Sequence, residues 1–211
     1  MTNNKISIIH FTYKGLNYIQ MLLMSKAATL IFKMKLKLNK VTFGNGIHCY
    51  NAIPLLQISK NATKVQFGEN FTLNAYTDHS WNSNNKIIVK SNAILIIGDN
   101  SGINGCMINC SKKIMIGNNV KIGGGTRISD TNHHSLDYQK RRTKEDSIDA
   151  KCAPISIKDD VFIGASCIIN KGVTIGEKSI IAAGSVVIKN IPANEIWGGN
   201  PAVFIAPIKE T

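Results

Sequence analysis

The sequence predicts an all-β solenoid, and two series of residues predict it. An aliphatic residue recurs at every sixth position from Ile157 to Val187. A second series, of small or short side chains, begins four places later and runs from Val161 to Ser185. Neither an α-helix nor an ordinary strand has a period of six, whereas the stacked coils of a solenoid repeat at fixed intervals of this kind.

Each six-residue unit supplies one short face and one corner of a triangular prism. The aliphatic residue points into the prism, and the small residue lets the backbone turn. Residues that tolerate turn conformations follow the aliphatics, at Gly164, Asn170, Gly176 and Ala182. Three such units close one coil of about 18 residues.

The length and composition fit one globular domain, or one domain with an appendage. The chain has 211 residues, of which 44% are hydrophobic and 18% are charged. Its net charge of +12 favours partners that carry negative charge, such as anionic lipid, a phosphorylated ligand or nucleic acid. No zinc-finger spacing, helix-turn-helix pattern or aromatic RNA-binding signature accompanies the charge, so we do not expect nucleic acid as the partner.

The five cysteines are odd in number and irregularly spaced, which fits a reducing cytoplasm. Cys167 occupies an inward position of the repeat and is predicted to be a core thiol. Cys106 and Cys110 lack the two-residue gap of a zinc knuckle or a redox pair. The N-terminus shows no secretory signal. We therefore predict a cytoplasmic protein, either free or peripheral on the inner face of the membrane.

The segment from Leu16 to about Lys37 predicts a helix of roughly 20 residues. Apolar residues recur there at spacings of three, four and seven, with lysines between them. The segment is too short, and too interrupted by Gln20, Ser25 and Lys26, to span a bilayer. Its apolar face either packs on this subunit or a neighbour, or lies on an anionic membrane surface with the lysines toward the headgroups.

Three regions follow from these patterns. They are an N-terminal helical extension over 1–40, a β-helix over 41–205 and a C-terminal tail over 206–211. Hexads are recognisable upstream of the strict repeat over 97–103 and 116–128, but the spacing over 41–94 is too irregular to place individual coils. The turn-rich segment 194–203 is predicted to cap the last coil.

A polar and charged segment over 129–154 interrupts the hexads. It contains the adjacent pair His133 and His134, with Asp130 and Asn132 beside them. A loop of this length between regular coils is either disordered or functional, and two histidines favour function.

These features resemble the hexapeptide-repeat acyltransferases, a superfamily that includes galactoside, maltose and many polysaccharide O-acetyltransferases. The resemblance covers 94–205 and is specific in the loop 129–137, the coils 157–187 and the closing residues 199–202. It implies a left-handed parallel β-helix with an N-terminal helix and an extended loop that carries the catalytic histidine. It also implies a homotrimer with active sites at subunit interfaces, acetyl-CoA as the donor, and a sugar hydroxyl as the acceptor in surface or capsular polysaccharide biosynthesis.

The resemblance further implies that His134 is the general base, because the family places this histidine immediately before a Ser or Pro, here Ser135. The chemistry agrees with this role. Attack of a hydroxyl on a thioester requires removal of the hydroxyl proton, and neutral imidazole suits that task near pH 7. A partner must fix the tautomer of the imidazole. Asp130, Asn132 and Asp137 are near in the sequence, and a backbone carbonyl would serve equally.

The coenzyme of the family lies along the last coils, and several positions here match its contacts. These are Gly164, Ala165, Ala183, Ile188, Lys189 and Trp197. By resemblance the backbone N–H of Ala165 would donate to the oxyanion, and Lys189 would meet a phosphate. Trp197 either stacks on adenine or seals the end of the prism.

The sequence departs from the family near its C-terminus. Val203 and Ala206 stand where relatives often carry a basic residue facing the nucleotide phosphate. Three lysines are candidates to replace that residue: Lys171, Lys178 and Lys209.

Three residues are candidates for binding the acceptor. Asn104 lies near the position where relatives bind acceptor, and His133 adjoins the proposed base. His79 stands in a short segment, Thr77 to Trp81, that is similar to the catalytic loop, although a turn histidine exposed to solvent is the simpler interpretation.

Three other functions stay open on the sequence. N-acetyl transfer to an amino sugar or an antibiotic would use the same fold, and a non-catalytic binding solenoid would leave the histidine loop without a role. A zinc enzyme of the β-helix carbonic anhydrase type would need three histidines at subunit interfaces. His133 and His134 are adjacent and no third histidine follows in the coils, so we expect no metal.

Overall fold

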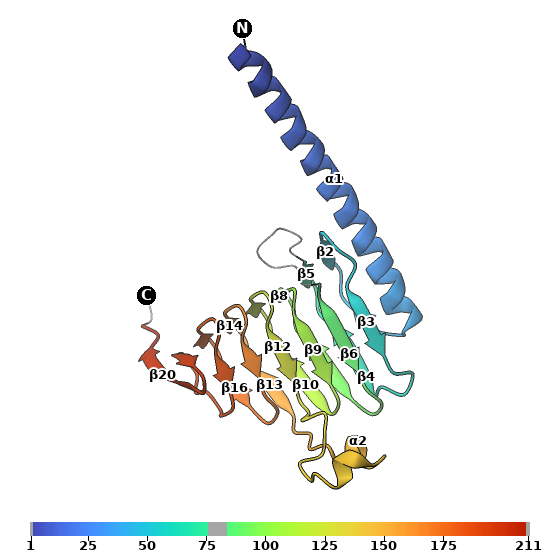
Figure 1. Cartoon of the computed structure of the whole chain (residues 1–211), viewed down its shortest axis with the longest axis vertical. Coiled ribbons are helices and arrows are strands. Elements are labelled where there is room, and N and C mark those ends of the chain that lie inside the picture. Colours follow the sequence, from blue (N-terminus) through green and yellow to red (C-terminus); the bar gives the residue numbers. More distant parts are fainter. Residues whose placement is uncertain (1, 76–83, 210–211) are drawn as a thin grey trace.

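The protein is a long helix followed by a three-faced parallel β-helix (Figure 1). The computed structural model describes residues 2–75 and 84–209, with side chains from residue 14 onward. Strands of successive coils pair in parallel and form three sheets, here termed A, B and C. The predicted all-β solenoid is therefore confirmed.

Each coil visits sheet A, then sheet B, then sheet C, so the prism has an A–B, a B–C and a C–A corner. Sheet A contains β1 (Thr42–Phe43), β4 (Lys64–Phe67), β7 (Ile94–Ile97), β10 (Lys113–Ile116), β13 (Ile155–Ile157) and β16 (Thr174–Ile175). Sheet B contains β2 (His48–Tyr50), β5 (Thr72–Asn74), β8 (Gly102–Asn104), β11 (Lys121–Ile122), β14 (Phe162–Ile163), β17 (Ile180–Ile181), β19 (Glu195–Gly199) and β20 (Ala202–Pro207). Sheet C contains β3 (Leu55–Ile58), β6 (Lys86–Val89), β9 (Met107–Cys110), β12 (Arg127–Ser129), β15 (Ile168–Ile169) and β18 (Val186–Val187).

The interior of the prism is the aliphatic series that the sequence predicts. All six residues of that series, from Ile157 to Val187, are buried, and so are the five smaller residues that run from Val161 to Ser185. Ile157 pairs with Ile175 in the next coil, one 18-residue turn later. Burial of stacked aliphatic side chains is the main favourable term in such a fold, because each coil contacts only its neighbours.

The early coils keep the same stacking although their spacing hides it in the sequence. Phe43 pairs with Phe67, and Phe67 pairs with Ile97, so both intervals exceed the length of the last coils. The extra residues fall between the strands along the chain, so the coils are longer while the sheets continue. A strict six-residue reading therefore fails over 41–94 while the solenoid continues.

Side chains at the A–B corner form a ladder that runs along the prism. Oδ1 of Asp99 accepts a hydrogen bond from the backbone N–H of Glu69 at 2.7 Å, and Oδ1 of Asn118 accepts one from Asp99 at 2.8 Å. The next residue of each turn has a positive φ, which Asn and Asp tolerate better than other side chains. These residues are Asn70, Asn100, Asn119 and Asp160.

The N-terminal helix is longer than predicted. α1 (Thr2–Leu38) begins at Thr2, so the predicted start at Leu16 is wrong. Gly15 lies inside the helix, where a glycine costs about 1 kcal/mol relative to alanine but does not end the helix. In the described part of the chain no helix combines the length and the apolarity needed to cross a membrane.

The C-terminal half of α1 covers the first coil, and the N-terminal half extends away from the solenoid (Figure 1). Phe32 and Leu36 are fully buried between the helix and the prism. The ring of Phe32 stacks on that of Phe67 with centroids 6.4 Å apart. The helix thus closes the N-terminal end of the core.

The opposite end is closed by a hairpin. β19 pairs in parallel with β17, and β20 folds back antiparallel on β19. Trp197 of β19 packs against the core and against Phe204 of β20. The closing segment therefore covers the last coil.

Candidate active site

The polar segment after β12 is an ordered loop that leaves sheet C and returns to sheet A, at the C–A corner (Figure 1). It contains the short helices η1 (Lys140–Arg142) and α2 (Asp146–Asp149). Its two ends are tied together by an antiparallel bridge between Thr131 and Cys152. The base of the loop is thereby fixed to the prism.

Asp130 anchors the loop and does not bind His134. Its side chain is fully buried, and its carboxylate accepts three backbone N–H bonds of 2.7 Å, from Ser111, Lys112 and Lys113. The prediction that Asp130, Asn132 or Asp137 fixes the imidazole is wrong, because Nδ1 of His134 contacts another carboxylate. Buried carboxylates are stable only when their oxygens are satisfied in this way, so Asp130 has a structural role.

The carboxylate that binds His134 belongs to Asp146 in α2. Nδ1 of His134 lies 2.6 Å from Oδ2 of Asp146. The pKa of Asp146 lies below its ordinary value, because it accepts this bond and also one from the backbone N–H of Ser135. An ionised carboxylate only accepts hydrogen bonds, so Nδ1 carries the proton and Nε2 is the free nitrogen. The His134 side chain is 69% exposed, and solvent or a substrate can reach it.

A second acid in α2 holds the loop around this pair. The buried Ser135 donates its hydroxyl to Oδ2 of Asp149 at 2.6 Å, and Nζ of Lys140 lies 3.0 Å from Oδ1 of the same carboxylate. These two contacts hold the pKa of Asp149 below its ordinary value, with the Ser135 bond as the larger cause. The sequence analysis did not predict that Ser135, Asp146 and Asp149 hold the loop around His134. The only sequence signal for the two acids was the acidic stretch 145–149.

The two histidines have different environments. Nε2 of His133 lies 3.0 Å from Oγ of Ser129, and its backbone has a positive φ of 66°. His133 thus uses the ring nitrogen that His134 leaves free. Asn132 joins the loop ends through its backbone N–H, which donates to the carbonyl of Lys151 at 3.0 Å.

The predicted coenzyme positions lie along the two margins of sheet C in the last coils. Ala165 and Ala183 are one coil apart at the B–C corner, where Gly184 donates its N–H to the carbonyl of Ala165. Within the described residues, the backbone N–H groups of Ala165 and Ala183 have no hydrogen-bond acceptor. A Cβ on Gly164 would lie 2.6 Å from the nitrogen of Ala183, so this glycine lets the two coils approach.

Ile188 and Lys189 follow β18 at the C–A corner, the corner from which the loop leaves the prism. Both side chains are exposed. Trp197 lies on sheet B, where its indole N–H donates to Glu195 at 2.6 Å. Its packing fits the interpretation that it seals the prism, and contact with adenine stays a prediction.

The acceptor candidates are not all placed by the fold. Asn104 lies in β8 and lines a hollow of about 220 Å³ on the outer face of sheet B, beside Gly102 and Lys121. On a three-sided prism, sheet B is the face opposite the C–A corner, so one chain does not bring Asn104 and His134 together. His79 lies outside the described residues.

In the part of the chain that the structure describes, no group of three His, Cys, Asp or Glu side chains is arranged to hold a metal ion. Cys167 is buried, as predicted for a core thiol, and burial raises its pKa.

Comparisons with known proteins give the family of the repeat. Residues 154–189 match the family described as the hexapeptide repeat of succinyl-transferase. Galactoside O-acetyltransferase of Escherichia coli is 38% identical over 97 residues, which are 46% of this chain and 45% of that protein. A hexapeptide-repeat acetyltransferase of Vibrio cholerae, solved with acetyl coenzyme A, is 40% identical with a TM-score of 0.50, over 55% of this chain and 61% of that one.

A more distant structure covers more of the chain. A variant of an N-acyltransferase of Bacillus cereus has a TM-score of 0.60 over 84% of this chain and 90% of that one, and its 17% identity shows the fold alone. The chain spans about half the length of the curated relatives it matches. The chain thus has a hexapeptide-repeat, left-handed parallel β-helix, and this part of it is similar in sequence to acetyltransferases.

Proposed function

We propose that this protein transfers the acetyl group of acetyl-CoA to a hydroxyl of a sugar, with His134 as the general base. The observation that carries the proposal is the contact between His134 and Asp146, which leaves Nε2 free on an exposed imidazole. A histidine fixed through Nδ1 by a carboxylate, with Nε2 free, is an arrangement suited to general-base catalysis.

The residues of the chain perform the transfer in two proton movements. Nε2 of His134 takes the proton of the acceptor hydroxyl while the hydroxyl oxygen attacks the thioester carbonyl carbon. Asp146 stabilises the imidazolium that forms. The N–H of Ala165, which lies at the B–C corner and would come from a neighbouring subunit, donates to the oxyanion. When the carbon–sulfur bond breaks, His134 returns the proton to the leaving sulfur, so the products are the acetyl ester and the free thiol.

The margin of sheet C fits the coenzyme. The unpaired N–H groups of Ala165 and Ala183 are donors on successive coils, as a ligand that carries several amides along its length requires. Lys189 supplies a positive charge on the other margin of the same sheet, suited to a phosphate. The acyl thioester would then run along the last coils toward the loop.

The site would be completed between subunits of a homotrimer. Asn104 and His134 lie on opposite sides of one prism, so an acceptor held at the hollow of sheet B would meet the histidine of a neighbouring chain. Closed symmetric assembly is the usual way for identical chains to build such shared sites. The acceptor in this proposal is a sugar of a surface polysaccharide precursor, acetylated in the cytoplasm.

Peripheral contact between α1 and the inner face of the membrane is part of the proposal. It is supported by the exposed apolar side chains of the helix and by its lysines. A polysaccharide precursor carried on a lipid would then be presented at the same surface.

The experiment measures thiol release from acetyl-CoA with a panel of sugars and matched amino sugars. The wild type is expected to release thiol with sugar hydroxyls, and His134→Ala to lose about 100-fold or more in kcat. Leu136→Ala, at an exposed position of the same loop, is the matched control and is expected to keep most of the activity. Turnover with amines alone would favour N-acetyl transfer, whereas no turnover and no coenzyme binding would overturn the proposal in favour of a binding solenoid.

A further inference from the structure

The face of α1 that turns away from the solenoid is apolar. Leu30, Met34 and Leu38 are exposed, and each lies two residues after a buried helix position, Ala28, Phe32 or Leu36. Two residues correspond to about 200° around a helix, so the exposed residues lie opposite the packed ones. The same face continues toward the N-terminus and forms an outer stripe of Leu16, Ile19, Leu23, Leu30, Met34 and Leu38.

The exposure of this outer stripe is large for a soluble surface. Leu23 is 62% exposed, Leu30 is 63% and Leu38 is 80%. Contiguous apolar surface of this kind marks a site of interaction with a protein or a membrane. We therefore expect the outer stripe to be covered by a binding partner.

The charge of the helix favours a membrane over a second copy of the chain as this partner. Residues 2–38 contain lysines and no Asp or Glu, and Lys26, Lys33 and Lys37 run along one edge of the stripe. Packing of the same face from a second copy would bring lysines against lysines, without a carboxylate of either helix to pair with them. An amphipathic helix with lysines beside its apolar face is suited to the anionic surface of a bilayer.

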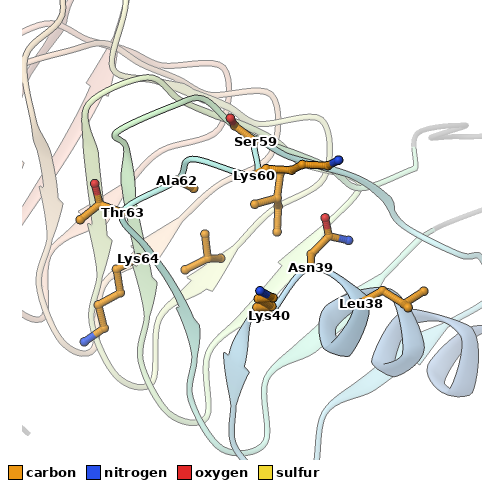
Figure 2. Close-up of a pocket in the computed structure, with 10 residues that line it drawn as sticks. Leu38, Asn39, Lys40, Ser59, Lys60, Ala62, Thr63 and Lys64 are labelled. Atoms are coloured by element: carbon orange, nitrogen blue, oxygen red, sulfur yellow. The ribbon is translucent and has the colours of Figure 1, made fainter.

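The stripe ends at a pocket. Leu38, its last residue, lines a cavity of about 470 Å³ between the end of α1 and the turn that precedes β4 (Figure 2). Ile58 and Val65 supply apolar lining, and three lysines are contributed from both sides of the cavity (Figure 2). They are Lys40, Lys60 and Lys64.

The pocket lysines are available for an anion. All three are exposed, and none forms an ion pair with another of the described residues. Three carbonyls of the last helical turn already accept hydrogen bonds from within the chain and therefore do not take up the pocket lysines. They belong to Lys35, Leu36 and Lys37, and the donors are Asn39, Lys40 and Val41.

We propose that the outer stripe and this pocket form one docking site for an anionic phospholipid bilayer. The stripe lies in the interface between headgroups and acyl chains, and the pocket takes one headgroup, with its phosphate on Lys40, Lys60 and Lys64. The continuity through Leu38 places both features on one surface. The proposal rests on the membrane contact suggested for α1 and is independent of the transferase chemistry.

The experiment is flotation of the full-length protein with vesicles. Phosphatidylcholine vesicles with about 30% phosphatidylglycerol are expected to carry the wild type upward, and pure phosphatidylcholine vesicles to carry little. The double variant Leu23→Glu and Leu30→Glu is expected to lower binding about tenfold or more, because it places charge in the interface. Its control puts the same substitutions at the exposed loop residues Leu136 and Ile148 and is expected to bind normally.

The pocket is tested with a triple variant, Lys40→Glu, Lys60→Glu and Lys64→Glu. Its control carries the same change of charge at three exposed lysines elsewhere: Lys112, Lys144 and Lys158. Vesicle binding is expected to fall about tenfold further in the pocket variant than in its control, because a lysine contributes only near the lipid surface. Equal losses of vesicle binding in the two variants would show that the pocket does not bind a headgroup.

Two readouts separate this proposal from the others. Oligomer mass is measured for each variant, and dissociation by the stripe substitutions without a loss of vesicle binding would assign the stripe to a second copy. Acetyl transfer to a soluble sugar is measured without vesicles and is expected to survive the stripe and pocket substitutions. A wild type that binds vesicles but transfers no acetyl group would remove the proposed activity alone, and one that ignores anionic vesicles would remove the docking site alone.

Discussion

Nδ1 of His134 and Oδ2 of Asp146 lie 2.6 Å apart, although twelve residues separate them along the chain. Oδ1 of the same carboxylate accepts the backbone N–H of Ser135 at 2.8 Å, so Asp146 holds both the imidazole and the backbone beside it. The hydroxyl of Ser135 in turn holds Asp149, in the last turn of α2. These contacts within the loop therefore fix the imidazole of His134 and leave its Nε2 free.

Substitution of Asp146 tests whether this contact orients the base. Asp146→Asn keeps the shape of the side chain but removes the charge that selects the Nδ1–H tautomer. We expect kcat for acetyl transfer to fall by about 100-fold with a small change in the KM for acetyl-CoA. Asp137→Asn is the control in the same loop and is expected to keep kcat near the wild-type value. Equal kcat for the wild type and Asp146→Asn would show that the contact is not part of catalysis.

Substitution of Asp130 separates anchoring from catalysis. Asp130→Asn leaves at least one of the three backbone N–H groups facing the NH2 group of the amide, which cannot accept a hydrogen bond, in a buried site. An unsatisfied buried donor costs about 1–3 kcal/mol, so the melting temperature is expected to fall. Asp146→Asn, on an exposed loop, is expected to melt like the wild type. A loss of activity in Asp130→Asn without any change in melting would return Asp130 to a catalytic role.

The sequence predicts those parts of this protein that depend on local repetition. The series from Ile157 to Val187 fixes the inward face of every late coil, because each residue packs on the one 18 positions away. The register of the early coils cannot be predicted in this way, because residues that pair there, such as Phe67 and Ile97, are more than 18 positions apart. Prediction from periodicity thus succeeds where coil length is constant.

The loop follows a different rule. His134 was recognisable from its neighbours in sequence, whereas its partner Asp146 depends on how η1 and α2 fold back. Asp130 is nearer in sequence but is used by three backbone N–H groups of the preceding coil. Proximity along the chain favours Asp130, and only the tertiary structure decides between the two acids.

Protonation of Asp146 and Asp149 at low pH is expected to break the hydrogen bonds that hold the loop around His134. The pKa values of Asp146 and Asp149 both lie below the ordinary 3.8, so their ionised forms are favoured by the folded loop. Their contribution to loop stability is fully present above the unfolded pKa and is lost as the pH falls through the lower folded values. The amide resonance of a labelled Ser135 should shift below pH 3.8 in the wild type. A transition centred above about pH 5 would contradict this assignment.

Thiol chemistry tests the packing of the prism. Burial raises the pKa of Cys106 to about 12, and that of Cys110 to about 12, so both are protonated at neutral pH. Because the thiolate is the reactive form, we expect both to resist alkylation at pH 8 in the folded protein and to react in concentrated guanidinium. Mass spectrometry of the modified peptides is the measurement. Rapid labelling of Cys106 in the folded protein would show that the coils open far more often than a packed solenoid allows.

Mixed assemblies test whether the active site is shared between chains. Asn104 on sheet B and His134 at the C–A corner lie on opposite sides of one prism, so the proposed site would take the two residues from different subunits. His134→Ala and Asn104→Ala are each expected to be nearly inactive alone. If the two are dissociated and reassembled together in equal amounts, about a quarter of the interfaces combine an intact His134 with an intact Asn104. Thiol release should therefore recover to about a quarter of the wild-type rate in the mixture. Reassembled single variants are the control, and a mixture that stays as inactive as they are would place both residues in the site of one chain. An Asn104→Ala variant that is fully active alone would instead remove Asn104 from the site.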